Sequence, residues 1–304
     1  MENKRVSVEM IFFEFRQKLA ENYRQEEIRH LVYILFEEWM GWTKAEVVIQ
    51  RQKLLKGEEV RRFREALGEL QKNKPLQYII GVSHFLDTKI KVKEGVLIPR
   101  PETEELVKLI ITDYQHRQYE SLSLMDIGTG SGCISIAIKK QMPCFDITAI
   151  DISAVALNVA SENSVLNQCK IQFILSDILN RQEWKKFPVF TVIVSNPPYI
   201  TDSERSIMHP NVVDYEPKEA LFVTDDDPLK FYKAIAEFAF LHLLRPGSLY
   251  IEINERFGNQ IKELLLSTGF DKAGVLKDIH GKDRFIHAEA KPLILDTSYW
   301  NIEH

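Results

Sequence analysis

The chain has 304 residues, of which 45% are hydrophobic and 27% charged, a composition typical of a soluble globular protein with room for two domains. Its net charge of −5 argues against a protein that binds mainly nucleic-acid phosphates, and no apolar run reaches the ~18 residues of a membrane span. Three scattered cysteines and an N-terminus without a signal-peptide pattern favour a cytoplasmic protein, with no membrane partner and no stable nucleic-acid partner expected.

Residues 1–74 are predicted to form a helical domain. Apolar residues recur three and four positions apart in two stretches, and Gly41 can end the first helix. The apolar positions are Ile28, Leu31, Val32, Leu35 and Phe36 in the first stretch and Val60, Phe63, Leu67 and Leu70 in the second. This part carries a slight excess of Lys and Arg, whereas the rest of the chain is acidic, so we expect it to recognise the substrate.

Residues 75–96 are predicted to form a β-hairpin connector. A boundary is indicated at Lys72–Pro75, and from Gln77 to Val92 the apolar period changes to two, with a turn at Leu86-Asp87-Thr88. The third part, residues 97–304, begins with a proline-rich approach. Thr103 or the acids beside it are expected to cap a helix that ends near His116.

From Ser121 onward, strands and helices alternate as in an α/β fold. The last two strands follow each other closely, so a final antiparallel pair is expected on an otherwise parallel, seven-stranded sheet. The strands are expected near residues 122–127, 146–151, 171–175, 190–195, 248–253, 273–278 and 284–289, and the helices near 132–141, 153–165, 227–244 and 256–268.

A glycine-rich loop follows the first of these strands. Its glycines alternate in the run from Asp126 through Gly128, Thr129, Gly130 and Ser131 to Gly132, which gives a tight turn that a ligand can approach closely. The spacing differs from the G-x-G-x-x-G of dinucleotide sites. An acid before the glycines would repel a pyrophosphate but suits a ligand with an ammonium group. Tight packing is the alternative reading of the glycines.

Two further acids end the next two strands. Asp151, with Ile152 beside it, is placed to accept hydrogen bonds from ribose hydroxyls. Asp177 could receive an adenine amino group, and Ile178 could cover the ring. Ammonium, ribose and adenine together describe S-adenosylmethionine. The sequence therefore predicts this cofactor, with S-adenosylhomocysteine as the product.

The fourth strand ends in a stiff polar turn, within the run FTVIVSNPPYI at residues 190–200. Two prolines fix the turn, so the Asn196 side-chain oxygen and the Pro197 carbonyl can accept the two N–H groups of a planar amide or amine. Pro198 belongs to the same turn, and Tyr199 can stack on the planar group. No strong base and no metal are needed, and none of the eight histidines is nominated.

The entrance for the acceptor is expected beside this turn. The segment from Ile200 to about Pro228 is long and polar, as loops next to active sites often are. Leu97 and Arg100, from the proline-rich approach, are assigned to the same entrance and to substrate binding.

Over nearly its whole length, the sequence resembles the HemK/PrmC family of release-factor glutamine methyltransferases. The matching stretches include PLQYIIG at 75–81, LIPRPETEELV at 97–107, DIGTGSGCISIAI at 126–138, SNPPYI at 195–200 and YEPKEAL at 215–221. The resemblance implies a class I methyltransferase fold dependent on S-adenosylmethionine. It also implies transfer of a methyl group to the glutamine amide nitrogen in the Gly-Gly-Gln loop of peptide-chain release factors. In the family, the cofactor residues correspond to Gly128–Gly132, Asp151 and Asn196, and the acceptor residues to Asn196–Tyr199.

Two positions depart from the family pattern, and other functions stay open. Asn254 stands where Gly is usual, and Ile178 where some members carry Trp; neither is expected to touch the transfer site. The alternatives are an adenine N6 nucleic-acid methyltransferase, a ribosomal-protein glutamine methyltransferase and a non-catalytic adaptor that binds S-adenosylmethionine. A monomer is the working expectation, although no sequence feature determines the oligomeric state.

Overall fold

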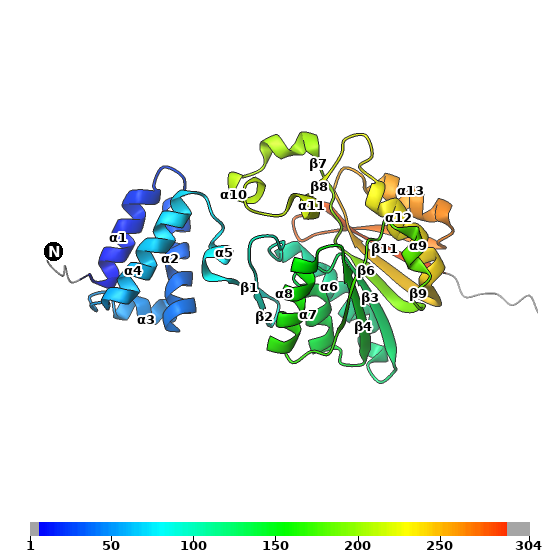
Figure 1. The fold of residues 1–304 in the computed structure, drawn as a ribbon, viewed down its shortest axis with the longest axis horizontal. Helices are drawn as coiled ribbons and strands as arrows, with labels where there is room; N and C mark the ends of the chain where they lie inside the picture. The colour runs from blue at the N-terminus through cyan, green and yellow to red at the C-terminus, as the bar shows by residue number, and fades with distance from the viewer. Residues whose placement is uncertain (1–5, 291–304) are drawn as a thin grey trace, which may run out of the picture. The chain divides into compact units, whose positions relative to one another are not determined.

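The computed structural model of the protein describes residues 6–290 and divides into two compact units (Figure 1). The helical unit contains the described chain from Val6 to Val82 together with His209–Tyr215. The sheet unit contains Ser83–Met208 and the described chain from Glu216 to Ala290. The tail at 291–304, to which the sequence assigns no role, lies outside the described residues.

Five helices build the N-terminal part of the helical unit. They are α1 (Val8–Leu19), α2 (Gln25–Met40), α3 (Lys44–Ile49), α4 (Gly57–Gln71) and α5 (Leu76–Ile80). The Ser7 hydroxyl caps α1, Thr43 forms a capping box at α3, and Gly41 ends α2 with a φ of 67°. Except for the half-buried Leu31, the two predicted apolar faces are buried in one core, which confirms their helical spacing.

The connector differs from its prediction at one point. Gln77–Ile80 is helical rather than extended, because the Pro75 carbonyl accepts from the backbone N–H groups of Tyr78 and Ile79. Gly81 then closes the turn with a φ of 77°. Leu76, four residues from Ile80, joins the core of the helical unit. The predicted hairpin follows as β1 (Val82–Phe85) and β2 (Thr88–Lys91).

The sheet unit holds a seven-stranded sheet whose order is β10-β11-β9-β6-β3-β4-β5. Strands β5, β4, β3, β6 and β9 run parallel, and β11 pairs antiparallel with both β9 and β10, as the sequence predicts. The strands are β3 (Leu122–Ile127), β4 (Phe145–Asp151), β5 (Gln172–Leu175), β6 (Phe190–Ser195), β9 (Leu243–Glu252), β10 (Lys272–Lys277) and β11 (Asp283–Ala290).

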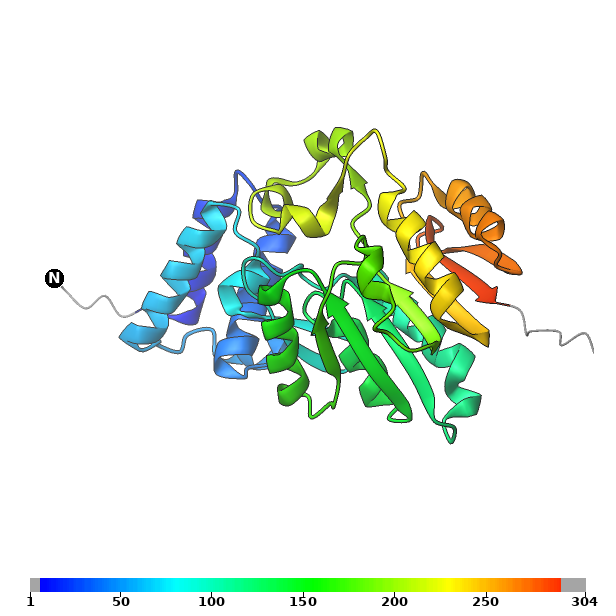
Figure 2. The same ribbon diagram turned by 45° about the vertical axis from the view of Figure 1, so that its right-hand side comes forward.

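Helices cover both faces of this sheet (Figures 1 and 2). On one face lie α6 (Pro101–Tyr114), α7 (Cys133–Gln141) and α8 (Ala154–Leu166). On the other face lie α9 (Arg181–Trp184), α12 (Lys230–His242) and α13 (Gly258–Thr268). A short 3-10 helix, η1 (Gln115–Arg117), follows α6 and agrees with the predicted end near His116.

The segment after β6 is folded rather than an open loop. It contains β7 (Ile200–Thr201), η2 (Asp202–Ile207), α10 (Pro210–Val213), α11 (Lys218–Leu221) and β8 (Phe222–Val223). Its middle part, His209–Tyr215, belongs to the helical unit, where the Tyr215 hydroxyl donates to the Lys72 carbonyl at 2.8 Å.

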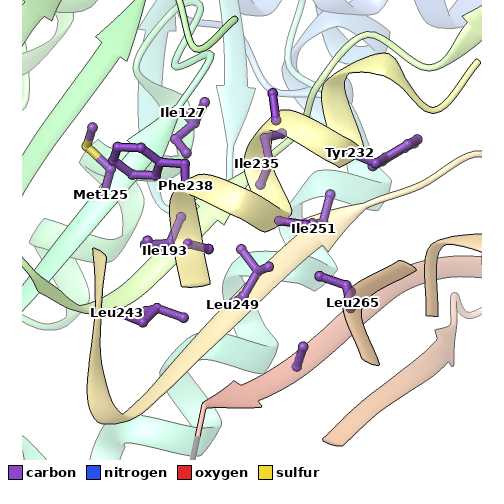
Figure 3. Close-up of a cluster of buried hydrophobic side chains, with 14 of the residues drawn as sticks. Met125, Ile127, Ile193, Tyr232, Ile235, Phe238, Leu243, Leu249, Ile251 and Leu265 are labelled. Carbon is purple, nitrogen blue, oxygen red and sulfur yellow. The ribbon is translucent and has the colours of Figure 1, made fainter. Parts of the chain in front are cut away.

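A large apolar core lies between α12, α13 and the sheet (Figure 3). Tyr232, Ile235 and Phe238 of α12 are fully buried against strand residues such as Ile193 and Leu249. Burying a side chain of this size contributes about 1.5–3 kcal/mol. This packing holds β6 and β9 in place, and with them the residues that follow the two strands.

Within residues 6–290, no helix is both long enough and apolar enough to cross a membrane.

Candidate active site

The predicted site residues gather where the parallel strands end. β3 pairs with β4 on one side and with β6 on the other, so Ile127 lies opposite both Ile150 and Ser195. The chain moves outward from β3 through β4 to β5 and then returns to β6, so the strand order reverses at β3. In open α/β sheets, ligands bind at such a reversal, beyond the carboxyl ends of the strands.

The glycine loop between β3 and α7 needs its glycines for two reasons. Gly128, Gly130 and Gly132 have φ values of 74°, 56° and 81°, in the left-handed region that glycine favours. At Gly132, an added Cβ would also lie 3.1 Å from the Cβ of Ala160 in α8, so the loop packs closely on that helix. At Gly128, an added Cβ would lie 4.0 Å from the Asn196 carbonyl oxygen, so the loop borders the turn after β6.

Asp126 lies beneath this loop and is completely buried. Its Oδ2 accepts from the hydroxyls of Thr129 and Ser135, both at 2.7 Å. Burial raises the pKa of the Asp126 carboxyl to about 6. Within the described chain, Asp126 Oδ1 and the buried Ser131 hydroxyl have no hydrogen-bond partner. Buried polar atoms are normally paired, so these two atoms lack a partner that a bound polar group could supply.

Asp151, at the end of β4, holds the loop from the other side. Its carboxylate accepts from the backbone N–H groups of Gly130 and Ser153, each at 2.8 Å. Burial raises its pKa in spite of these bonds. A carboxylate has about four acceptor positions, so lone pairs remain for a hydroxyl ligand. The neighbouring Ile152 is 64% exposed and offers an apolar surface.

The third predicted acid site is less open. Asp177 is half-buried, and its Oδ1 accepts from the Leu179 backbone N–H at 2.8 Å, which closes a local turn. Ile178 is buried among core residues, and its carbonyl accepts from the indole N–H of Trp184 at 2.9 Å. Of the two predicted isoleucines, Ile152 is therefore the more accessible.

In the turn after β6, the Asn196 Nδ2 donates to the Thr103 hydroxyl oxygen at 3.1 Å. Within residues 6–290, neither Asn196 Oδ1 nor the Pro197 carbonyl accepts a hydrogen bond. The Tyr199 hydroxyl donates to Glu252 Oε1 at 3.0 Å, which fixes its ring. Burial, followed by the Glu252 carboxylate, raises the pKa of Tyr199 well above its usual value, so the phenol stays protonated.

Sequence reasoning missed the partners of this turn. Thr103 or the acids beside it were expected to cap α6, and this prediction is wrong. The N-cap of α6 is Arg100, without a side-chain bond, and Thr103 instead donates to Glu252 Oε2 at 2.7 Å. Glu252 is 1% exposed, and burial raises its pKa. Its position at the end of β9, beside β6 in the sheet, is the signal that could have identified it.

The prediction that Asn254 does not touch the transfer site is also wrong. Its Nδ2 donates to the Tyr199 carbonyl at 3.1 Å and to Glu204 Oε2 at 2.9 Å. Its backbone does not adopt a positive φ, so an Asn fits at this position without strain. The side chain therefore ties the turn after β6 to η2.

The two predicted entrance residues differ in their surroundings. Arg100 is half-buried and forms an ion pair with Glu216, whose side chain is 1% exposed. Glu216 also accepts from the Ile98 backbone N–H at 3.1 Å, so it fixes the proline-rich approach. Leu97 is half-buried and directly precedes Ile98 in the chain. Arg100 is thus engaged by the protein itself.

Among the described residues, no group of His, Cys, Asp and Glu side chains could hold a metal ion. The candidate site therefore consists of a glycine loop, buried carboxylates, and a turn with two carbonyl-type oxygens left open. Such a site can bind a polar ligand and align an N–H donor.

Comparison with known proteins identifies two family regions in this chain. The PrmC N-terminal domain matches residues 13–81, and the Methyltransferase small domain matches residues 104–214. The latter contains the glycine loop and the turn after β6. These matches agree with the class I methyltransferase fold expected from the sequence.

Among relatives, a release factor glutamine methyltransferase of Flavobacterium psychrophilum is 40% identical over 274 residues, which cover 90% of this chain and 95% of the relative. The corresponding protein of Bacteroides thetaiotaomicron is 39% identical, over 90% of this chain and 96% of its own. The crystal structure of a methyltransferase from Pyrococcus furiosus covers 78% of this chain and 100% of its own, with a TM-score of 0.50 at 16% identity; this likeness concerns the fold alone. On the strength of the two relatives, the chain belongs to the release factor glutamine methyltransferase family.

Proposed function

We propose that this protein transfers a methyl group from S-adenosylmethionine to the side-chain amide nitrogen of the glutamine in the Gly-Gly-Gln motif of peptide-chain release factors. One observation carries the proposal. Two open oxygens, Asn196 Oδ1 and the Pro197 carbonyl, lie beside a glycine loop at the reversal of the sheet. An amide NH2 has two donors, which these oxygens match. The names of the relatives support the same substrate.

The cofactor residues are assigned from the chemistry of the open groups. Bound S-adenosylmethionine supplies an electrophilic methyl on a sulfonium. The Asp126 carboxylate suits the ammonium group, and the loop Gly128–Gly132 lets the cofactor approach its backbone. Asp151 accepts from the ribose hydroxyls with its remaining lone pairs, and the exposed Ile152 covers the adenine. Asp177 and Ile178 then border the adenine from the end of β5.

The acceptor residues align a poor nucleophile. The nitrogen lone pair of an amide is delocalised, so its alignment with the methyl group is the chief requirement. Asn196 and Pro197 accept both N–H groups and stabilise the positive charge that develops on nitrogen. The Tyr199 ring, fixed through Glu252, stacks on the planar amide. The proton can leave after methyl transfer, so no base is assigned.

We propose that the helical unit recognises the release factor. A groove of about 430 Å³ opens between α1, α2 and α3, with aromatic and cationic side chains on its walls. Phe13 is 62% exposed there, and Arg16 and Arg29 line the same groove. An apolar site with cationic neighbours fits a protein segment that carries apolar and acidic residues. The cofactor residues all lie in the sheet unit.

The experiment that tests the function uses methyl-labelled S-adenosylmethionine. The full chain is incubated with a release factor, and in parallel with a release factor whose Gly-Gly-Gln glutamine is replaced by alanine. Label should enter only the first. Equal labelling of both proteins would refute the proposed acceptor. Labelling of adenine-containing DNA in place of the release factor would favour the nucleic-acid alternative.

A further inference from the structure

Four hydrogen-bonded side chains connect the two ends of the turn after β6: Asn196 and Tyr199 belong to the turn, and Thr103 and Glu252 link them. Asn196 Nδ2 donates to Thr103 Oγ1 at 3.1 Å, and the Thr103 hydroxyl donates to Glu252 Oε2 at 2.7 Å. The other carboxylate oxygen of Glu252 accepts from the Tyr199 hydroxyl at 3.0 Å. Glu252 and Thr103 are 1% and 2% exposed, so protein groups rather than bulk water determine these bonds.

The direction of each bond follows from the one before it. A carboxylate can only accept, so the Thr103 hydroxyl proton must point toward Glu252. The Thr103 oxygen is then left with acceptor lone pairs alone on its other side. A side-chain amide has one end that donates and one that accepts, and only the donating end can face such an oxygen. Asn196 is therefore held with Nδ2 toward Thr103 and Oδ1 away from it.

We propose that Thr103 and Glu252 are positioning residues that select the amide orientation of Asn196, and thereby make the site specific for an acceptor that carries N–H donors. The inference rests on the proposed function and deepens it. Neither residue touches the acceptor. They act through Asn196, whose two amide ends have nearly the same shape and differ in hydrogen-bond role.

The consequence is discrimination between glutamine and glutamate at the acceptor position. With Oδ1 presented, Asn196 and the Pro197 carbonyl both offer acceptors, so a glutamate carboxylate would meet two oxygens without a proton. Without the Thr103 hydroxyl, the Asn196 amide can rotate by half a turn and present Nδ2. A glutamate side chain would then find a donor.

The surroundings of Glu252 keep its acceptor role in place. Its carboxylate faces two hydroxyl donors, Thr103 and Tyr199, and the positive charge of Arg284 acts on it from β11. The Glu102 carboxylate acts in the opposite direction from α6. Burial is the largest influence and raises the pKa of the Glu252 carboxyl, and the two hydroxyl donors and Arg284 oppose this effect.

The test compares Thr103→Val, which removes the hydroxyl at nearly constant shape, with Thr103→Ser, which keeps it. Each full-length enzyme is assayed for transfer to the release factor. It is then inhibited by two release-factor variants that cannot accept a methyl, with glutamate or alanine in place of the Gly-Gly-Gln glutamine. The readout is the ratio of the inhibition constant of the glutamate form to that of the alanine form. Affinity for S-adenosylmethionine is measured alongside.

For wild type and Thr103→Ser, the glutamate form should inhibit less well than the alanine form. In Thr103→Val the ratio should fall by about tenfold, the effect of relieving one unpaired buried group, while cofactor affinity stays unchanged. Glu252→Gln, which presents an N–H to Thr103 or Tyr199, should shift the ratio in the same direction by less. If Thr103→Val does not fold, the ratio measured for Glu252→Gln tests the positioning role instead, and an unchanged ratio would overturn it.

The possible outcomes distinguish a failure of the positioning role of Thr103 and Glu252 from a failure of the proposed function. Loss of turnover in Thr103→Val with an unchanged ratio would overturn the positioning role, because a loosened turn weakens both inhibitors alike. Wild-type turnover in Thr103→Val would overturn it too. Absence of transfer by the wild-type enzyme would overturn the proposed function itself, before any variant is compared.

Discussion

The replacement Asn196→Ala tests the role of the turn after β6 most severely. It removes Oδ1, one of the two open oxygens proposed to accept the amide N–H groups. Loss of one preorganised group of this kind typically reduces turnover by ~100- to 1000-fold, or ~2.7–4 kcal/mol. Cofactor affinity should change far less, because the glycine loop and its bond from Gly130 to Asp151 are untouched.

The structure also limits the effect of this replacement on folding. Asn196 is half-buried and donates one hydrogen bond, to Thr103, and a neutral bond of this kind contributes about 0.5–1.5 kcal/mol. Thr103 keeps its own bond to Glu252, so no buried donor is left unpaired. A loss of about 1 kcal/mol lowers the melting temperature of a domain of this size by only about 2–4 °C. An assay near 25 °C therefore measures chemistry rather than unfolding.

Asn196→Asp is the matched control. Aspartate retains an acceptor oxygen, but it has no N–H for Thr103, whose proton is already given to Glu252. Two oxygens would then face each other, and this variant should also be slow. Single-turnover transfer and titration of S-adenosylmethionine separate chemistry from binding. Near-normal turnover in Asn196→Ala would show that the turn is only a scaffold and would refute this reasoning.

Three other predictions concern the cofactor, the helical unit and pH. Asp151→Ala should weaken binding of S-adenosylmethionine by about ten- to a hundredfold, and an unchanged calorimetric dissociation constant with a normal melting curve would move the ribose contact elsewhere. A chain that begins at Ser83 should bind S-adenosylmethionine but methylate a release factor poorly; full activity of this shortened chain would disprove recognition by the helical unit. Burial raises the pKa of Asp126 to about 6, above ~3.9 in the unfolded chain, so the ligand-free protein should lose stability as the pH rises from about 4 to about 6. Asp126→Asn should reduce the dependence of stability on pH, measured from melting curves at several pH values. It should not remove this dependence, because the pKa values of Asp151 and Glu252 are raised as well. An unaltered dependence on pH would contradict the assignment to Asp126.

The sequence predicted those features that depend on local pattern. Strands such as β4 and β6 are rich in apolar and β-branched residues, and the loop after β3 shows its glycines directly in the sequence. Gly41 was identified as a helix end because helices often end in a left-handed backbone conformation, which glycine adopts easily. The five residues Leu76–Ile80, in contrast, span little more than one helical turn, too short to distinguish a period of 3.6 from one of two.

The supports of the site depend on contacts between distant parts of the chain. Thr103 and Glu252 are 149 residues apart in sequence, and Ile98 is 118 residues from Glu216. No local pattern predicts which buried hydroxyl meets which buried carboxylate. Thr103, three residues into α6 from its N-cap, resembles a capping residue in sequence, and only the packing of α6 beside β9 turns it toward Glu252.

The most direct test of the account is to locate the methyl group by tandem mass spectrometry of the release factor after reaction with the full-length protein and S-adenosylmethionine. The account predicts one added methyl, on the side-chain amide nitrogen of the Gly-Gly-Gln glutamine, and its loss under the same conditions with Asn196→Ala. A methyl group on another residue, or a release factor left unmodified by a protein that binds S-adenosylmethionine, would contradict it.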